Sequence, residues 1–239
     1  SALKDGTLKI GGTVVCASSG NTGASVAMLA ATLGLNAVII TSPKCSKEKV
    51  SAIRAYGATL HIEDDYMGAE IRLSQENPDW LSFDQYNNLR NSEAHYLGTG
   101  TEIWKQTSGK VTHFIASMGT TGTIVGTSKY LKSMNPDIVT IGVQPEEGAS
   151  IPGIRKWPEE YIPKIFSDEN IDQIIYITQD QAESTARELA TKEGIFSGPS
   201  SGGTTYVALE IAKKAKDALI VSIICDRGDR YISTGIFNK

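Results

Sequence analysis

A run of small and polar residues, Ser18-Ser19-Gly20-Asn21-Thr22-Gly23, stands between an apolar stretch and a stretch with helical periodicity. Hydroxyls and an amide at the start of a helix, beside its free N–H groups and positive dipole end, suit a bound carboxylate. In a parallel sheet, ligands bind beyond the carboxyl ends of the strands, where such loops lie. A polar capping turn that binds nothing explains this motif equally well when it is taken alone.

The second candidate is the loop Gly119-Thr120-Thr121-Gly122-Thr123, which also follows an apolar run and precedes a helical pattern. Its glycines allow close backbone approach, and its threonines supply hydroxyls, which together suit a phosphate. The spacing matches neither a Walker loop nor the dinucleotide fingerprint. Because the loop contains no Lys or Arg, it favours a small phosphate monoester over a nucleoside triphosphate. A simple tight turn is the other interpretation.

Two further loops have weaker signals. Gly198-Pro199-Ser200-Ser201-Gly202 matches the nucleophile elbow of hydrolases, but that triad requires a histidine after the serine, and His61, His95 and His113 all precede Ser200. The histidine spacing offers no zinc site either. The loop Asp84-Gln85-Tyr86-Asn87-Asn88 is by itself only a turn signal.

Short apolar runs alternate with helical patterns, which predicts βαβ units and mostly parallel sheets. Strands are expected at residues 13–17, 37–40, 60–62, 81–83, 113–117, 139–144 and 219–225. Helices are expected at residues 24–33, 47–56, 66–77, 102–106, 124–132, 179–192 and 203–215. Residues 145–170 carry little periodicity and several prolines, which predicts a long functional loop.

Composition excludes several functions. A net charge of −4 and 40 % hydrophobic residues describe a globular protein without the basic face that nucleic acids require. No apolar run approaches the roughly 20 residues of a membrane span, and the first residues lack a signal peptide's apolar core. The widely spaced Cys16, Cys45 and Cys225 indicate a reducing, cytoplasmic setting, with Cys16 and Cys225 expected to be buried and inert.

Taken in chain order, at residues 18–23, 84–88, 119–123 and 198–202, the four loops resemble those of fold-type II pyridoxal-phosphate enzymes. The resemblance is specifically to the cysteine synthase family. The resemblance runs from Lys4 to Phe237 and is closest to the B-type branch, through Val143-Gln144-Pro145-Glu146-Glu147-Gly148, Ile151-Pro152-Gly153-Ile154-Arg155 and Cys225-Asp226-Arg227-Gly228-Asp229-Arg230-Tyr231. It implies an α/β protein of two domains, with twisted, mostly parallel sheets covered by helices on both faces. Residues 1–96 are expected to form the smaller domain and residues 97–239 the larger.

The resemblance also implies a role for each loop. Pyridoxal 5′-phosphate would be held at its phosphate by Gly119, Thr120, Thr121, Gly122 and Thr123. Asn21 would bind its 3′ oxygen, and Ser200 would face its pyridine nitrogen. The substrate carboxylate would contact Ser18, Ser19, Thr22 and Gln85. Arg155 would lie near the second substrate.

The implied reaction is β-replacement on O-acetylserine by sulfide or thiosulfate, giving cysteine or S-sulfocysteine. A serine hydroxyl at the pyridine nitrogen suits β-elimination, because it does not stabilise a protonated ring as an aspartate would. The family also implies a homodimer and allows serine acetyltransferase as a partner.

The sequence departs from the family pattern at the Schiff-base lysine, which the family carries upstream of the first loop. Lys4-Asp5 echoes that motif, but its spacing to Gly20 is too short, so no residue of this sequence is assigned as catalytic. The lysine is instead expected in an N-terminal segment of the larger domain that is missing from this sequence. Ser197 replaces a frequent B-type cysteine, which weakens the expectation of thiosulfate use. Two alternatives stay open: a lysine-less homologue that binds a ligand or partner without turnover, and an enzyme using phosphoserine or serine.

Overall fold

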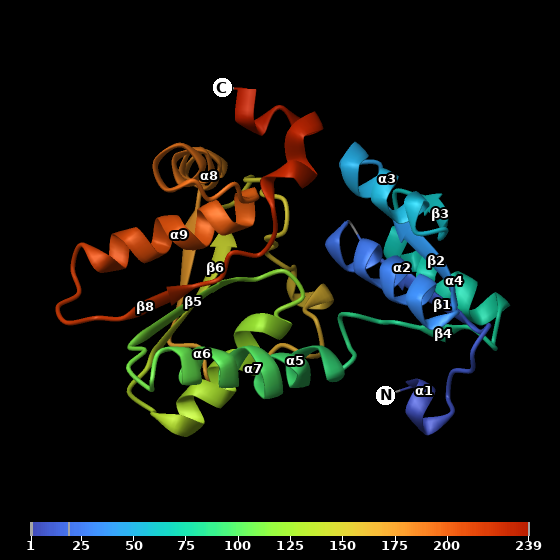
Figure 1. Cartoon of the computed structure of the whole chain (residues 1–239), viewed down its shortest axis with the longest axis horizontal. Coiled ribbons are helices and arrows are strands. Elements are labelled where there is room, and N and C mark those ends of the chain that lie inside the picture. The colour runs from blue at the N-terminus through green and yellow to red at the C-terminus, as the bar shows by residue number, and fades with distance from the viewer. Residues whose placement is uncertain (1, 19, 239) are drawn as a thin grey trace. The chain divides into compact units, whose positions relative to one another are not determined.

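The computed structural model describes residues 2–18 and 20–238, without the side chain of Glu160, and divides the chain into two compact units (Figure 1). The first unit holds the residues up to Gln85 together with Arg230–Gly235. The second begins at Tyr86, runs to Asp229 and includes the residues after Gly235. The contacts therefore group residues 86–96 with the second unit, and the sequence-based domain boundary after residue 96 stays a prediction.

The first unit is built on a parallel sheet with strand order β3-β2-β1-β4. Its strands are β1 (Thr13–Ala17), β2 (Asn36–Thr41), β3 (Thr59–Ile62) and β4 (Leu81–Ser82), and its helices are α1 (Ala2–Asp5), α2 (Asn21–Leu33), α3 (Lys47–Ala55) and α4 (Tyr66–Glu76). Side chains alternate across a strand, so Val14 and Cys16 pack with α2 and α3, while Val15 and Ala17 pack with α4. Both faces of the sheet are thus covered by helices.

The second unit repeats this plan with a parallel sheet of order β7-β6-β5-β8. Its strands are β5 (His113–Ser117), β6 (Val139–Pro145), β7 (Gln173–Ile177) and β8 (Ile220–Ser222), and its helices are α5 (Arg90–Ala94), the π-helical η1 (His95–Gly100), α6 (Thr101–Gln106), α7 (Gly122–Met134), α8 (Gln179–Glu193) and α9 (Pro199–Ala212). Figure 1 shows α8 and α9 on one face of the sheet and α6 and α7 on the other. Phe114 and Ala116 face α6 and α7, whereas Ile115 faces α8 and α9.

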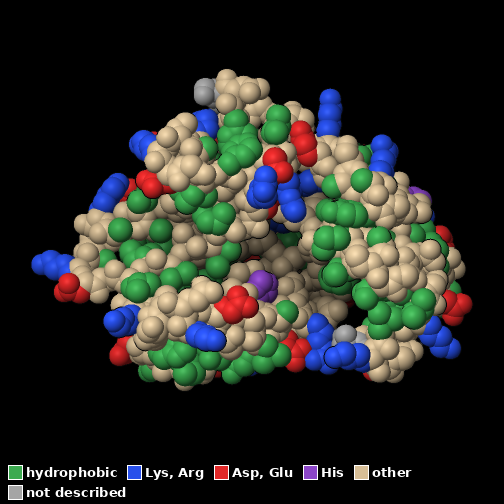
Figure 2. All heavy atoms as spheres, viewed as in Figure 1, with side chains coloured by type: hydrophobic (Ala, Val, Ile, Leu, Met, Phe, Trp, Pro, Cys, Tyr) green, Lys and Arg blue, Asp and Glu red, His purple; other side chains and the backbone are tan. Residues whose placement is uncertain are grey.

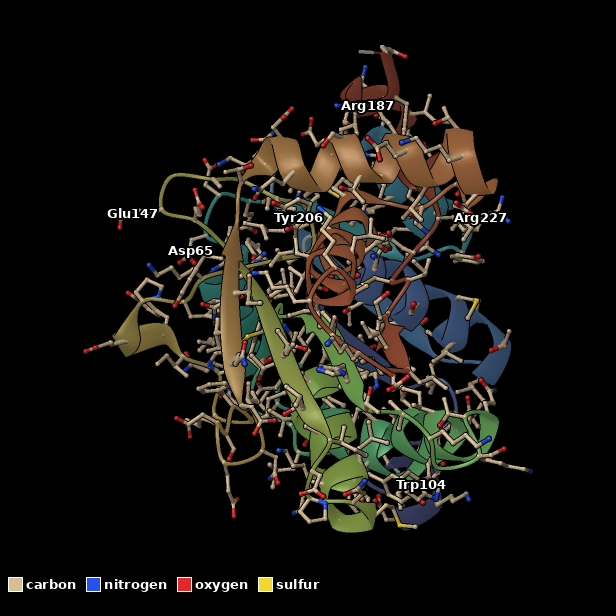
Figure 3. All side chains as sticks on the ribbon, turned by 90° about the vertical axis from the view of Figure 1, so that its left-hand side faces the viewer. Asp65, Trp104, Glu147, Arg187, Tyr206 and Arg227 are labelled. Carbon is tan, nitrogen blue, oxygen red and sulfur yellow. The ribbon has the colours of Figure 1, made fainter. Side chains whose placement is uncertain are left out.

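The chain also contains three short 3₁₀ helices: η2 (Glu159–Tyr161), η3 (Gly228–Thr234) and η4 (Ile236–Asn238). Helices α8 and α9 are further joined by a hydrogen bond from Gln181 Nε2 to the hydroxyl of Tyr206, at 2.9 Å; Tyr206 is labelled on α9 in Figure 3. The expected fold, two parallel α/β domains with helices on both faces, is confirmed. Strand β7 was not predicted, nor were α5 and η1, which precede the helix expected at residues 102–106.

The surface and the cysteines add two observations. Hydrophobic side chains gather over α2 in Figure 2, where Met28, Leu29 and Leu33 are 40–50 % exposed. Within the described residues, no helix is long and apolar enough to cross a membrane. Cys16 is buried, as expected, but Cys225 is exposed, so the expectation that Cys225 is buried is wrong.

Candidate active site

The longer helices differ in whether a side chain caps their first turn. Helices α3, α4 and α8 each begin with a side-chain cap, supplied by Ser46, Asp65 and Thr178. Helices α2, α7 and α9 begin at Gly20, Thr121 and Gly198 with no side-chain cap. The first N–H groups of a helix need acceptors, and an anion is one that they bind well. Among the described helices of nine or more residues, the uncapped starts are those of the Asn21, Thr121 and Ser200 loops, although the shorter α5 and α6 also begin without a side-chain cap.

The start of α7 fits a phosphate group. Thr121 is only 3 % exposed, and its Oγ1 has no hydrogen-bond partner among the described residues. Its φ of 73° is left-handed, which is uncommon for a β-branched residue and marks a constrained loop. A buried hydroxyl without a partner costs free energy unless a ligand satisfies it. A phosphate on the free N–H groups of α7 would do so.

Two side chains of the preceding helical segment support this loop. Asn91 Nδ2 donates to Thr120 Oγ1 at 3.0 Å, and His95 Nε2 lies 3.2 Å from Thr123 Oγ1. The other ring nitrogen of His95 is 2.9 Å from Thr99 Oγ1. Because the contacts with Thr120 and Thr123 join residues 29 and 28 positions apart, no local sequence pattern revealed them. Asn91 and His95 thus hold the threonines of the phosphate loop.

His95 makes the stability of this region depend on pH. Burial lowers the pKa of His95, so the folded protein favours the neutral ring. Its contribution is present above the unfolded value of about 6.5 and is lost as pH falls through the lower folded pKa. We therefore expect the free energy of unfolding to fall as the pH drops below about 6.5, and to fall less in His95→Gln. Urea titrations across this range measure the difference.

The matched control for this pH prediction is His61→Gln, on β3 of the other unit.

The contribution of carboxylates to stability changes at lower pH than that of histidines. Burial alone would raise the pKa of Asp172, but hydrogen bonds from Lys132 and Thr140 and the Lys132 charge lower it overall. Its contribution is therefore lost below about pH 4, outside the histidine window. Parallel stability curves for the native protein and His95→Gln would contradict the role of His95.

The irregular segment after β6 lies against the phosphate loop. Trp157 Nε1 donates to the carbonyl of Gly119 at 2.8 Å, and Arg155 N donates to the carbonyl of Met118 at 2.8 Å. The Arg155 guanidinium carbon lies 5.2 Å from the centre of the Trp157 ring, within cation–π range. The same segment reaches the Ser200 turn, because a Cβ at Gly153 would lie 3.1 Å from Ser200 Oγ. Within the second unit, the phosphate loop, Arg155 and Ser200 are therefore brought together.

Ser200 lies in the first turn of α9, where it is 2 % exposed. Pro199 at the first helical position explains why the helix begins there, earlier than predicted. Behind the turn, Cys225 N donates to Ser201 Oγ at 2.9 Å, and Cys225 Sγ lies 3.3 Å from Ser117 Oγ. Ser117 is the last residue of β5, and Cys225 follows the end of the neighbouring strand β8. The Ser200 turn therefore lies at the carboxyl edge of this sheet. The sequence alone did not associate Cys225 with it.

In the first unit, Gln85 joins the loops after β1 and β4. Gln85 is 5 % exposed; its Nε2 donates to Ala17 O at 2.7 Å, and its Oε1 accepts from Thr22 Oγ1 at 2.8 Å. Ser18 is also buried, and its Oγ accepts from Gly20 N at 3.1 Å. Ser18, Thr22 and Gln85 therefore form one cluster. Ser19, predicted to bind the same carboxylate, lies outside the described residues.

Asn21 is held by a residue from the far end of the chain. Arg230 Nη1 donates to Asn21 Oδ1 at 2.9 Å, and the carbonyl of Arg230 accepts from Ser46 Oγ at 2.7 Å. The next residue, Tyr231, is 1 % exposed and packs its ring 4.0 Å from Lys49 Nζ. Since an amide has one oxygen and one NH₂ group, the Arg230 bond fixes which end Asn21 presents elsewhere.

Among the described residues, no group of His, Cys, Asp and Glu is arranged to hold a metal ion. Lys4, whose neighbours echo the Schiff-base motif, lies exposed in the short α1. The groups of the candidate site that can bind a ligand are therefore the helix N-termini, the hydroxyls, the side-chain amides and the Arg155 guanidinium.

Two parallel α/β units with uncapped, hydroxyl-rich helix starts form the architecture of fold-type II enzymes, and the profile of the family described as "Pyridoxal-phosphate dependent enzyme" matches residues 1–226. The chain belongs to this family. It is 48 % identical over 244 residues to cysteine synthase B of Salmonella typhimurium, covering 100 % of this chain and 80 % of that protein. The Escherichia coli cysteine synthase B is likewise 48 % identical over 243 residues, with the same coverage.

A solved structure of O-ureido-L-serine synthase superposes with a TM-score of 0.91 and 30 % identity, over 99 % of this chain and 79 % of that one. These findings confirm the resemblance drawn from the four loops.

Proposed function

We propose that the protein catalyses pyridoxal-phosphate-dependent β-replacement, converting O-acetyl-L-serine and sulfide to L-cysteine and acetate. Thiosulfate in place of sulfide would give S-sulfocysteine. The observation that carries the proposal is the uncapped start of α7, where the buried Thr121 hydroxyl lacks a partner among the described residues. Near-half identity to proteins named cysteine synthase B supports the choice of reaction within the family.

Three sets of residues would each hold one part of the cofactor. The phosphate loop would hold its phosphate through backbone N–H groups and threonine hydroxyls. Asn21 would donate its amide N–H to the 3′ oxygen, since Arg230 occupies the amide oxygen. The Ser200 hydroxyl would donate to an unprotonated pyridine nitrogen. When bound, the cofactor withdraws electrons from the α-carbon of an amino acid, which makes the α-proton acidic and allows a β-substituent to leave.

The substrate carboxylate would bind at the uncapped start of α2, beside Ser18 and the side-chain amide of Gln85. Thr22 already donates its hydroxyl proton to Gln85, so its role is to orient that amide. The acetate of O-acetylserine leaves with the electron pair of the Cβ–O bond, and the sulfur nucleophile then forms the new Cβ–S bond. Arg155 supplies a positive charge suited to an anionic sulfur donor. The prediction that the Schiff-base lysine lies outside this sequence stays a prediction.

Thr22→Val tests the orienting role of Thr22. Valine has nearly the shape of threonine but donates no hydrogen bond, so the Gln85 amide loses one partner that fixes it. We expect KM for O-acetylserine to rise about three- to tenfold, the effect of one hydrogen bond, with kcat nearly unchanged. Steady-state kinetics measure this, with Thr22→Ser as the control that keeps the hydroxyl. Equal KM values for the two variants would refute the orienting role.

The function itself is tested with the full-length gene product loaded with pyridoxal phosphate. Incubation with O-acetylserine and sulfide should form cysteine and acetate in equal amounts. Competition between O-acetylserine, phosphoserine and serine identifies the preferred amino-acid substrate. A protein that binds the cofactor and amino acids yet forms no product from any of the three would be the non-catalytic binding homologue instead.

We further propose a cytoplasmic homodimer that can engage serine acetyltransferase. Family resemblance supports both points, and the absence of disulfides among the three cysteines agrees with a reducing compartment. Light scattering of the purified protein, alone and mixed with the acetyltransferase, tests both assemblies. A monomeric mass with no change on mixing would contradict them.

A further inference from the structure

Helix α4 carries a buried carboxylate that the proposed reaction does not use. Glu70 is 7 % exposed, and no basic side chain among the described residues lies within ion-pair distance of it. Burying an acidic side chain is unfavourable unless hydrogen bonds compensate. Most acidic residues on a helix face solvent, so the position of Glu70 calls for a specific reason.

The compensation comes from two strand ends of the same sheet. Glu70 Oε2 accepts from Ala17 N at 2.8 Å, at the last residue of β1. Its Oε1 accepts from Ser82 Oγ at 2.8 Å, at the end of β4, and from Asp84 N at 3.2 Å. One carboxylate thus spans the carboxyl ends of β1 and β4.

The two backbone N–H groups that Glu70 binds stand next to residues of the cluster formed by Ser18, Thr22 and Gln85. Ser18 follows Ala17, and Gln85 follows Asp84. Asp84 has a left-handed φ of 42°, a conformation that is unfavourable for a residue other than glycine unless its surroundings hold it. The hydrogen bond from Asp84 N to Glu70 is one such restraint. Glu70 therefore acts on both halves of the cluster that Gln85 also bridges through Ala17 O.

We propose that Glu70 is a positioning residue: it fixes the loops after β1 and β4 so that Ser18 and Gln85 together receive the substrate carboxylate. The expected effect on KM rests on the proposed function, whereas the expected effect on the loop backbone does not. Glu70 does not touch the substrate. Its effect is transmitted through backbone N–H groups that only a carboxylate at this place can bind simultaneously.

Glu70→Gln is the sharpest variant because it keeps the shape and removes one acceptor. The amide oxygen can take Ala17 N, and the amide NH₂ can donate to Ser82 Oγ, since a hydroxyl also accepts. Asp84 N then faces a donor and loses its hydrogen bond. The substitution should therefore loosen the Asp84–Gln85 backbone while leaving β1 in place.

Two measurements test this. In Glu70→Gln, amide hydrogen exchange over residues 81–86 should accelerate about tenfold or more, without a comparable change in β1. KM for O-acetylserine should rise about tenfold, with kcat within about twofold. Binding of L-serine should weaken, whereas binding of ethanolamine, which lacks the carboxylate, should not. A purely structural role would not separate these two ligands.

The matched control is Glu76→Gln, on the same helix with a side chain 56 % exposed. It should match the native protein in every measurement. If Glu70→Gln also matches, the positioning role is overturned. If the native protein and Glu76→Gln both lack activity, the proposed reaction fails, while hydrogen exchange still decides whether Glu70 holds the loop.

A second variant keeps the test decisive if Glu70→Gln does not fold. Ser82→Ala removes one donor but leaves both backbone N–H groups on Glu70. It should fold and raise KM by about two- to threefold only. A tenfold rise in Ser82→Ala would assign the effect to Ser82 instead of the backbone contacts and so overturn the proposal.

Discussion

Replacing Gly122 with alanine should reduce the affinity for pyridoxal phosphate at least about 100-fold, which corresponds to about 2.7 kcal/mol. A Cβ at Gly122 would lie 2.0 Å from Asn91 Oδ1 and 2.5 Å from its Cγ, far closer than atoms can approach. Either the Asn91 side chain must rotate away or the backbone of α5 or α7 must shift to relieve the contact. Because Asn91 also donates to Thr120, either movement disturbs the loop proposed to hold the phosphate.

The fluorescence of Trp157 offers a direct measurement of this loss. Its indole donates to the carbonyl of Gly119, so cofactor binding at the loop should change its emission. The matched control is Gly98→Ala in η1, where a new Cβ meets no atom within 4 Å. This control should bind the cofactor normally.

A compensating substitution adds a stricter test of the Gly122 argument. Asn91→Ala removes the atoms that the new methyl group meets, so the double variant should recover part of the lost affinity. Recovery will be incomplete because Thr120 loses its partner. A double variant no better than Gly122→Ala would show that the clash with Asn91 is not the cause.

The second large effect is expected at Arg230. Arg230→Gln removes the charged donor that fixes the oxygen end of the Asn21 amide, so that amide can turn and present either end to the cofactor. We expect about tenfold weaker binding of pyridoxal phosphate, the loss of about 1.4 kcal/mol, within the range of a charge-assisted hydrogen bond. Titration of the cofactor absorbance measures this affinity.

A double-variant cycle separates this route from a general loss of stability. If Arg230 acts through Asn21, then Arg230→Gln should have little further effect in an Asn21→Ala background. Arg227→Gln is the matched control, because Arg227, labelled in Figure 3, is nearby in sequence. Its side chain is 79 % exposed. Additive losses in the cycle would contradict the positioning of Asn21 by Arg230.

The main strands could be predicted because their signal is local. Strands β1 and β5 are apolar runs bounded by polar turns, and the structure gives both the predicted bounds. Strand β7 was missed because only its last residue is fully buried, so Gln173–Ile177 carries a weak pattern next to a long irregular segment. Helix α2 begins at Asn21 and not at Ala24, because its first turn is made of residues that on their own resemble a loop.

The supporting residues of the site could not be predicted for a different reason. Glu70 looks like an ordinary solvated residue of an acidic helix, and Asn91 lies in a polar stretch that indicated a break. Their roles depend on contacts with residues up to 53 positions away, and Arg230 contacts a residue 209 positions away. The sequence shows which loops can bind anions, whereas folding decides which distant side chains hold those loops.

The return of Arg230–Gly235 to the first unit has a consequence for synthesis of the protein. Tyr231 is buried, so the core of that unit is incomplete until residues 230–235 have left the ribosome. A unit whose last piece arrives so late cannot finish folding first, although its strands are made first. Fragments ending near residue 85 should consequently be partly folded and prone to aggregate unless the late segment is fused back through a linker.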